Sequence, residues 1–131
     1  MERYRKNAGA VYALKYHLVW CPKYRRPVLE GEVAARLEQI LKETCQELEA
    51  EILALEIMPD HVHLFVASDP RWAVAGLISR LKGRSSRLLR NEFPHLRSRI
   101  PTLWSRSYYA GSVGRVSEKT VQRYIEEQQG R

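Results

Sequence analysis

Residues 52–67 read ILALEIMPDHVHLFVA, in which two apolar runs flank a Pro59-Asp60 pair. Each run has the length and the apolar content of one β-strand, and a Pro-Asp pair is typical of a tight turn. The stretch therefore predicts a β-hairpin, with one strand at 52–58 and the next at 61–67.

The second strand of this hairpin separates two kinds of side chain. Successive residues of a strand point to opposite faces of a sheet, so Val62, Leu64 and Val66 are expected to pack into the core. His61 and His63 then share the other face, about 7 Å apart along the chain. One side of the strand is thus apolar, and the other carries two imidazoles.

The chain on either side of the hairpin shows strand-like and helix-like patterns in turn. Alternating apolar residues predict a strand, and apolar residues three and four positions apart predict a helix. Gly83, followed by Ser85 and Ser86, is expected to kink or divide the second helix. The predicted elements outside the hairpin are a strand at 11–20, a helix at 30–50, a helix at 72–92, a strand at 107–113 and a helix at about 117–129.

This order is β-α-β-β-α-β followed by a terminal helix, which is the order of the ferredoxin-like fold that RNA-recognition domains share. It predicts an α+β architecture in which two helices cover one face of an antiparallel sheet and leave the other face open. The chain has 131 residues, the size of one domain. We therefore expect residues 1–131 to form a single domain.

The charge of the chain is concentrated in two segments. Residues 1–27 carry a net charge of +6 and residues 71–106 a net charge of +8, whereas residues 28–70 carry −8. This distribution favours a polyanionic partner, either nucleic acid or an anionic membrane surface. The sequence shows no apolar run of membrane-spanning length, no secretory signal pattern and only two cysteines. We therefore expect a reduced, cytoplasmic protein without a membrane span.

The histidine pair is a candidate metal site. Two imidazoles on one face of a strand can bind one ion, although the same pattern also occurs as two half-exposed histidines without a metal. A tight site needs a third ligand. The last helix carries Tyr124 and Gln128 one turn apart on one face, so a phenol and an amide oxygen could approach the same ion. A packing role for Tyr124 and a surface role for Gln128 are the alternatives.

Together these features resemble the single-tyrosine transposases of the IS200/IS605 group, which belong to the HUH nucleases. The resemblance covers nearly the whole chain, in order and at compact spacing. The matching segments are YHLVWCPKYRRPVL (16–29), MPDHVHLFV (58–66), LKGRSS (81–86), LWSRSYYAGSVG (103–114) and VQRYIEEQ (121–128).

The resemblance implies an enzyme that cuts single-stranded DNA at the ends of a mobile element and rejoins it through a 5′-phosphotyrosine. It implies that Tyr124 is the nucleophile and that His61, His63 and Gln128 are metal ligands. The ion expected beside a phosphate is Mg²⁺ or Mn²⁺, with Zn²⁺ also compatible with imidazoles. The family also implies a homodimer and DNA with subterminal hairpins, and leaves open whether the tyrosine serves its own or the partner's histidines.

Two further sets of residues are candidates for DNA contacts. Basic and hydroxyl side chains can hold backbone phosphates, and aromatic rings can stack on unpaired bases. The candidate phosphate contacts are Lys82, Arg84, Ser85, Arg87, Arg25 and Arg26. The candidate stacking rings are Tyr4, Tyr24, Trp104, Tyr108 and Tyr109. The segment from Gly111 to Gly114 is either a hinge for the tyrosine helix or an ordinary turn.

Three other functions compete with this hypothesis. A domesticated relative would act on repeated palindromes in a host genome. A ferredoxin-like nucleic-acid-binding module without activity would have a similar charge distribution. A small metalloenzyme with a substrate other than nucleic acid is disfavoured by the +8 segment.

Overall fold

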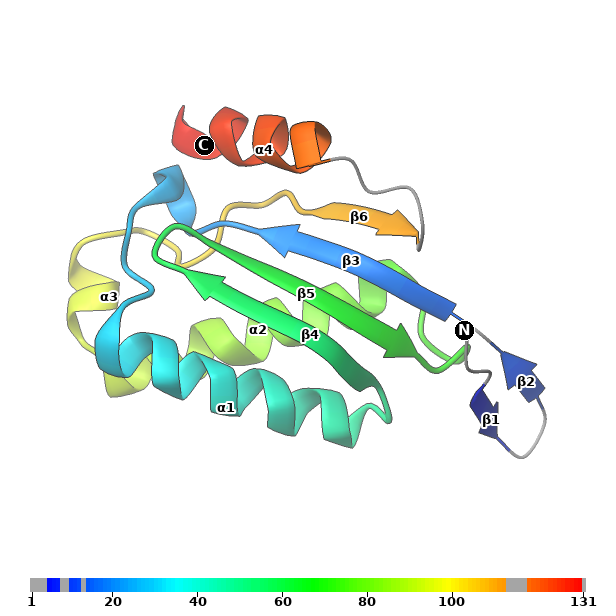
Figure 1. Ribbon diagram of the computed structural model, residues 1–131. Helices are drawn as coiled ribbons and strands as arrows, with labels where there is room; N and C mark the ends of the chain where they lie inside the picture. The colour runs from blue at the N-terminus through cyan, green and yellow to red at the C-terminus, as the bar shows by residue number, and fades with distance from the viewer. Residues whose placement is uncertain (1–4, 8–9, 13, 113–117, 131) are drawn as a thin grey trace.

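The centre of the molecule is a four-stranded antiparallel sheet with the strand order β4-β5-β3-β6 (Figure 1). The computed structural model describes residues 5–7, 10–12, 14–112 and 118–130. The main elements of the domain are β3 (Leu14–Trp20), α1 (Gly31–Glu47), β4 (Glu51–Met58), β5 (His61–Ser68), α2 (Val74–Glu92) and β6 (Tyr109–Ser112). Their β-α-β-β-α-β order confirms the predicted α+β, ferredoxin-like fold.

The first strand of this sheet is shorter than the strand predicted at 11–20. Ala10–Tyr12 forms β2, which pairs with β1 (Arg5–Asn7) in a separate two-stranded sheet. Pairing within the main sheet begins at Leu14, which lies opposite Ser68. The start of the alternating pattern is thus part of a second sheet, and the prediction of one continuous strand is wrong there.

The predicted hairpin is present and contains one irregularity. Met58 lies opposite His61, so the chain reverses at Pro59 and Asp60 as expected. The register between β4 and β5 shifts at a bulge between Ile52 and Ala54. Strict alternation would put Ile52 and Leu55 on opposite faces of β4. The bulge allows both to pack against the core, and it leaves Leu53 exposed.

Helices α1 and α2 cover one face of the sheet (Figure 1). Their buried residues recur at helical spacing, for example Leu37 and Leu41 in α1 and Leu77 and Leu81 in α2. Helix α2 runs from Val74 to Glu92 without interruption. The predicted division of this helix at Gly83 is therefore absent. Within the described residues, no helix is long and apolar enough to cross a membrane.

The core lies between these helices and the sheet. Leu18 and Trp20 of β3 and Val62, Leu64 and Val66 of β5 have no exposed surface, as the alternation of the hairpin predicted. The segment at 93–106, between the predicted helix at 72–92 and the predicted strand at 107–113, closes one end of the core. It contains the short helix α3 (His95–Ser98), and its Trp104 ring meets Trp20 edge-on at 5.9 Å between centroids.

The C-terminal part of the chain returns to the sheet through β6. This strand spans Tyr109–Ser112, less than the 107–113 predicted. Helix α4 (Glu118–Glu127) and a 3₁₀ turn, η2 (Gln128–Gly130), end the chain (Figure 1). Gly114, the second glycine of the expected hinge, lies outside the described residues.

Candidate active site

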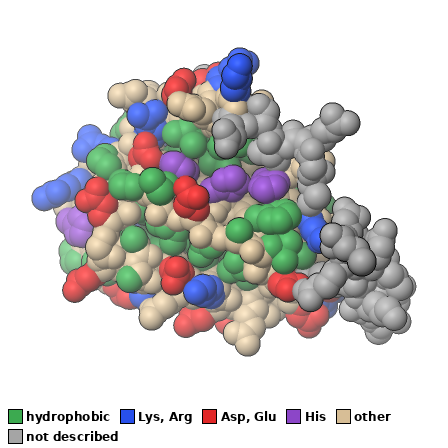
Figure 2. All heavy atoms as spheres, in the orientation of Figure 1, with side chains coloured by type: hydrophobic (Ala, Val, Ile, Leu, Met, Phe, Trp, Pro, Cys, Tyr) green, Lys and Arg blue, Asp and Glu red, His purple; other side chains and the backbone are tan. Residues whose placement is uncertain are grey.

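The face of the sheet opposite α1 and α2 carries the predicted histidine pair. Val62 and Leu64 point into the core, so His61 and His63 point the other way. His63 lies opposite Val19 of β3 on one side and opposite Glu56 of β4 on the other. Figure 2 shows histidine side chains gathered in a row on this face. Both imidazoles are half-buried.

His61 is held in place by a neighbouring carboxylate. Its Nδ1–H donates a hydrogen bond of 2.9 Å to Asp60 Oδ1, and Arg25 Nε lies 3.2 Å from the other oxygen of Asp60. A carboxylate on one ring nitrogen fixes the orientation of the ring and leaves the other nitrogen for a metal ion. Arg25, predicted to contact phosphate, thus has an acidic partner within the protein.

His63 is in contact with a third histidine. Its Nε2 lies 3.1 Å from Nδ1 of His17, which is in β3. The His17 ring stacks on Phe65 with a centroid distance of 4.3 Å and an angle of 4° between the planes. Burial lowers the pKa of both His17 and His63, and the nearby His17 ring lowers the pKa of His63 further because it disfavours a second charge. Neutral imidazole is the form that binds metals.

Tyr124 lies over the same face of the sheet. Its ring centroid is 6.3 Å from that of Tyr109, which is the partner of Val19 across the β3–β6 pair. Since residues directly opposite each other share a face, Tyr109, Val19 and His63 form one row across three strands. Tyr124 thus packs against one end of a row that has His63 at its other end.

The hydroxyl of Tyr124 is hydrogen-bonded and largely shielded from solvent. Ser107 Oγ lies 3.0 Å from it. Burial raises the pKa of the Tyr124 phenol to about 12, although the bond to Ser107 acts in the opposite direction. The phenol is therefore protonated at neutral pH in this arrangement and must lose its proton to react.

The oxygen and the nitrogen of the Gln128 amide are both hydrogen-bonded to other groups. Its Oε1 accepts hydrogen bonds from Ser105 Oγ (3.0 Å) and Ser107 Oγ (2.9 Å), and its Nε2 donates to the backbone carbonyl of Tyr124. The side chain is 1% exposed. In the described part of the chain, no hydrogen bond joins Gln128 to either His61 or His63.

The fit of a metal ion to these residues is therefore partial. Two imidazoles on one face, one of them oriented by Asp60, suit a divalent ion. Among the described residues, no three His, Cys, Asp or Glu side chains are grouped to hold an ion. The third predicted ligand, the oxygen of Gln128, is bonded to two serine hydroxyls instead of being free. The ligand set His61, His63 and Gln128 remains a prediction.

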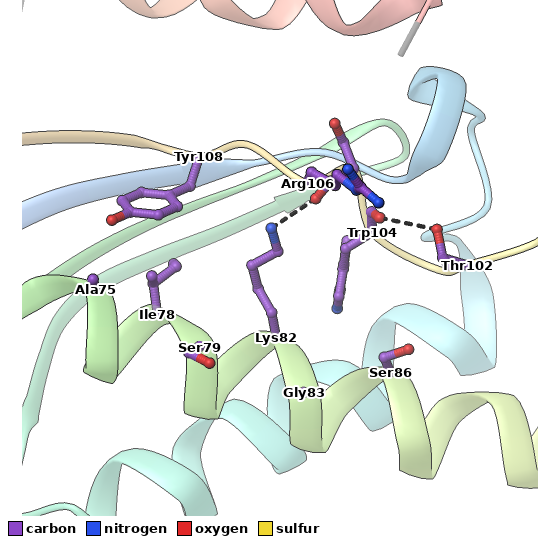
Figure 3. Close-up of a pocket in the computed structure, with 11 residues that line it drawn as sticks. Ala75, Ile78, Ser79, Lys82, Gly83, Ser86, Thr102, Trp104, Arg106 and Tyr108 are labelled. Atoms are coloured by element: carbon purple, nitrogen blue, oxygen red, sulfur yellow. Dashed lines mark hydrogen bonds between the residues drawn. The ribbon is translucent and has the colours of Figure 1, made fainter.

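Two of the predicted phosphate contacts do not fit their positions. Lys82 reaches from α2 toward the segment that carries Arg106 (Figure 3), where its Nζ donates to the carbonyls of Ser105 (2.7 Å) and Ser107 (3.1 Å). Burial lowers the pKa of Lys82 to about 8. Ser85 is fully buried. Its hydroxyl donates a hydrogen bond to the backbone carbonyl of Leu81 and accepts one from the indole N–H of Trp104. Both side chains are therefore hydrogen-bonded within the protein instead of facing a DNA phosphate.

The other candidates for DNA contact differ in exposure. Arg26 and Arg87 are exposed, whereas Arg84 is half-buried and ion-paired with Glu47. Tyr24 is 41% exposed and Trp104 is 6% exposed, so only the former presents a ring to solvent. Tyr108 and Tyr109 are half-buried. Tyr4 lies outside the described residues. A cavity of about 370 Å³ lies beside Lys82 and is also lined by Trp104, Arg106 and Tyr108 (Figure 3).

Comparison with known proteins identifies the family of this chain. The family described as "Transposase IS200 like" matches residues 10–128. The chain belongs to the IS200-like transposase family. The function class that this membership supports is DNA transposition. This confirms the family that the sequence motifs suggested.

Individual relatives of this IS200-like transposase show how far the similarity extends. ISDra2 transposase TnpA of Deinococcus radiodurans is 40% identical over 95% of the chain and 90% of its own length. The transposase of insertion sequence IS200 from Salmonella typhimurium is 35% identical over 87% of the chain and 76% of its own length. A crystal structure described as a transposase from Deinococcus radiodurans R1 superposes with a TM-score of 0.84 at 40% identity, covering 97% of this chain and 99% of the other.

A more distant structure shares the fold alone. It is a REP-associated tyrosine transposase bound to a REP hairpin, with a TM-score of 0.58 and 13% identity, covering 96% of this chain and 69% of the other. At that identity the likeness shows only that the two chains have a common architecture.

Three residues of the site were not identified from the sequence of this IS200-like transposase. His17 follows the period-two pattern of its strand and lies on the face opposite Leu18, which was a signal for a third histidine on the open face. Ser105 and Ser107 lie just before β6, where the structure has neither a helix nor a strand. Their contacts to Gln128 and Tyr124 depend on tertiary packing, so no local signal identified them.

Proposed function

We propose that this transposase cuts and rejoins single-stranded DNA through a covalent bond to Tyr124, in a metal-dependent reaction. The observation that supports the proposal is the row of Tyr109, Val19 and His63, because Tyr124 packs against Tyr109 at one end of the row and His63 lies at the other end. Two strand spacings, about 10 Å, separate β6 from β5. Tyr109 and His63, at the two ends of the row, are therefore about 10 Å apart.

His61 and His63 are the residues that would hold a divalent ion, Mg²⁺ or Mn²⁺. Such an ion, when bound, neutralises charge on the scissile phosphate and orients it for in-line attack. Asp60 holds the His61 ring, and burial keeps His63 neutral, so both side chains are suited to act as ligands. Gln128 would join them only after its oxygen is released by Ser105 and Ser107.

The chemistry at Tyr124 is a transesterification. The phenol oxygen forms a bond to phosphorus while the bond from phosphorus to the 3′-oxygen breaks, and the phenol proton is lost as the 3′-hydroxyl gains one. The product is a 5′-phosphotyrosine, which preserves the energy of the phosphodiester bond. A second 3′-hydroxyl then attacks the phosphotyrosine and restores the phenol. Rejoining therefore needs no nucleoside triphosphate.

The proposed substrate is single-stranded DNA with hairpins near the element ends. Exposed Arg26 and Arg87 support an interaction with backbone phosphates. The distant structural neighbour binds a REP hairpin, which supports a hairpin substrate by analogy of fold. We also propose a homodimer, and β4 at the edge of the sheet, with Leu53 and Met58 exposed, supports a self-association surface.

The test is covalent capture of DNA from the element's own flanks. Wild-type protein incubated with these single-stranded oligonucleotides and Mn²⁺ is expected to give a protein–DNA band that survives denaturation. Tyr124→Phe should lose the band and still bind DNA, and His61→Ala, His63→Ala or a chelator should also abolish it. His95→Ala changes an exposed histidine of α3 and serves as the matched control.

Two outcomes would contradict separate parts of the proposal. A band of undiminished intensity with Tyr124→Phe would remove the tyrosine from the reaction. Cleavage that continues at full rate with chelator would remove the metal while leaving the tyrosine in place.

A further inference from the structure

The contact between His17 and His63 has the geometry of a direct hydrogen bond. The ring centroids are 5.3 Å apart and the two facing nitrogens 3.1 Å apart. The centroid distance exceeds the nitrogen distance by about two radii of an imidazole ring, so both nitrogens lie near the line that joins the ring centres. Their in-plane lone-pair directions therefore point at each other.

His17 is itself fixed by its surroundings. Its ring is parallel to that of Phe65, its partner across the β3–β5 pair. On the other side of β3 its partner is Gly111, which has no side chain that could displace the ring. A stacked ring within a paired strand has little freedom to rotate, so His17 offers His63 a contact at a fixed position.

We propose that His17 is a positioning residue for the metal-ligating His63, which donates Nε2–H to His17 Nδ1 and is thereby left with an unprotonated Nδ1 for the ion. This inference rests on the proposed metal-dependent function. In a hydrogen bond between two neutral imidazoles, one nitrogen must donate and the other accept. If His17 were the donor, His63 would be protonated at Nδ1 and would have no lone pair for an ion.

The same geometry argues against His17 as a second ligand of one ion. Two ligands of one ion direct their lone pairs toward a common third point. Here the two lone-pair directions face each other along one line. His17 therefore acts through His63, in the way that the carboxylate of Asp60 acts on His61.

The test uses three variants and two measurements in the absence of DNA. His17→Phe keeps a ring that can stack on Phe65 but removes both nitrogens, and His17→Asn places an amide near the position of Nδ1. His95→Phe is the matched control, because His95 lies on α3 and not on this face. The first measurement is nitrogen NMR of the His63 ring without metal, and the second is Mn²⁺ affinity by paramagnetic resonance.

In the wild type, we expect His63 to be protonated at Nε2 and bare at Nδ1. In His17→Phe the two tautomers should mix, and Mn²⁺ affinity should fall by about 10- to 100-fold. His17→Asn should restore most of both properties, and His95→Phe should change neither. Amide spectra of each variant establish that it is folded.

An unchanged tautomer and an unchanged Mn²⁺ affinity in folded His17→Phe would overturn the inference. If that variant does not fold, the NMR measurement on the wild type decides: a His63 ring protonated at Nδ1 would also overturn the inference. The two failures are distinguishable. If the proposed metal site fails, His63→Ala will leave Mn²⁺ affinity unaltered; if only this inference fails, Mn²⁺ affinity will depend on His63 and not on His17.

Discussion

Tyr124 illustrates how the surroundings of one side chain set its reactivity. Its hydroxyl is hydrogen-bonded to Ser107, and its burial raises the pKa to about 12. Because the pKa is raised, the protonated phenol is the favoured form in the folded protein, and the phenolate becomes the main form only above that value. The nucleophile is thus kept weak in this arrangement, and it gains strength as the pH rises.

The rate of adduct formation should therefore increase with pH. Below the raised pKa the phenolate fraction grows about tenfold per pH unit, so the single-turnover rate should rise steeply between about pH 7 and 9. Ser107→Ala should lower the rate at each pH, because the Ser107 bond lowers the pKa of the phenol. Ser98→Ala, on the exposed surface of α3, is the control. A rate that does not change with pH would show that loss of the phenol proton does not limit the reaction.

Residue-level prediction from the sequence succeeded where a strand pattern was sufficient. His61 and His63 were placed on the open face because Val62 and Leu64 had to be buried, and the structure agrees. The hydroxyl partners of Tyr124 and Gln128 could not be predicted in this way. They come from the stretch just before β6, which Lys82 of α2 contacts through its backbone and the C-terminal residue Gln128 through its serine hydroxyls.

Helix α2 shows that local amino-acid composition does not by itself determine whether a helix is continuous. Gly83 and two serines suggested a break, yet the helix is continuous over 19 residues. Ser85 donates to the carbonyl of Leu81 within the same helix and accepts from Trp104, so tertiary packing compensates for the weak helix propensity of the segment. The bulge in β4 is another local feature that packing determined, since two apolar side chains had to reach the same core.

Two glycine substitutions should test this interpretation by opposite effects on stability. Gly83 lies inside α2, and a Cβ there would meet no atom within 4 Å, so Gly83→Ala should stabilise the protein by about 1 kcal/mol. Gly31 begins α1 with φ +55° and is equally unobstructed, so Gly31→Ala should destabilise it by about 1–2 kcal/mol. Urea denaturation measures both. Destabilisation by Gly83→Ala would mean that α2 is not continuous in solution.

At the scale of the whole molecule, the fold brings distant segments of the chain to one surface. Tyr109 of β6, Val19 of β3 and His63 of β5 align only because the sheet has the order β4-β5-β3-β6. The β-α-β-β-α-β order was readable from the sequence, and with it the open face that carries the histidine pair. The position of α4 relative to that face was not, because it depends on Tyr124 packing near Tyr109 and on Gln128 bonding to two serines.

The central claim is that Tyr124 is the residue to which DNA becomes attached, and the most direct test is to locate that attachment. The covalent product formed with Mn²⁺ is trimmed by nuclease, the protein is digested, and the peptide that carries the nucleotide is sequenced by mass spectrometry. We predict a 5′-nucleotide on Tyr124, within the peptide of α4. A nucleotide on Tyr109, whose ring is 6.3 Å away, or on any other residue would contradict it.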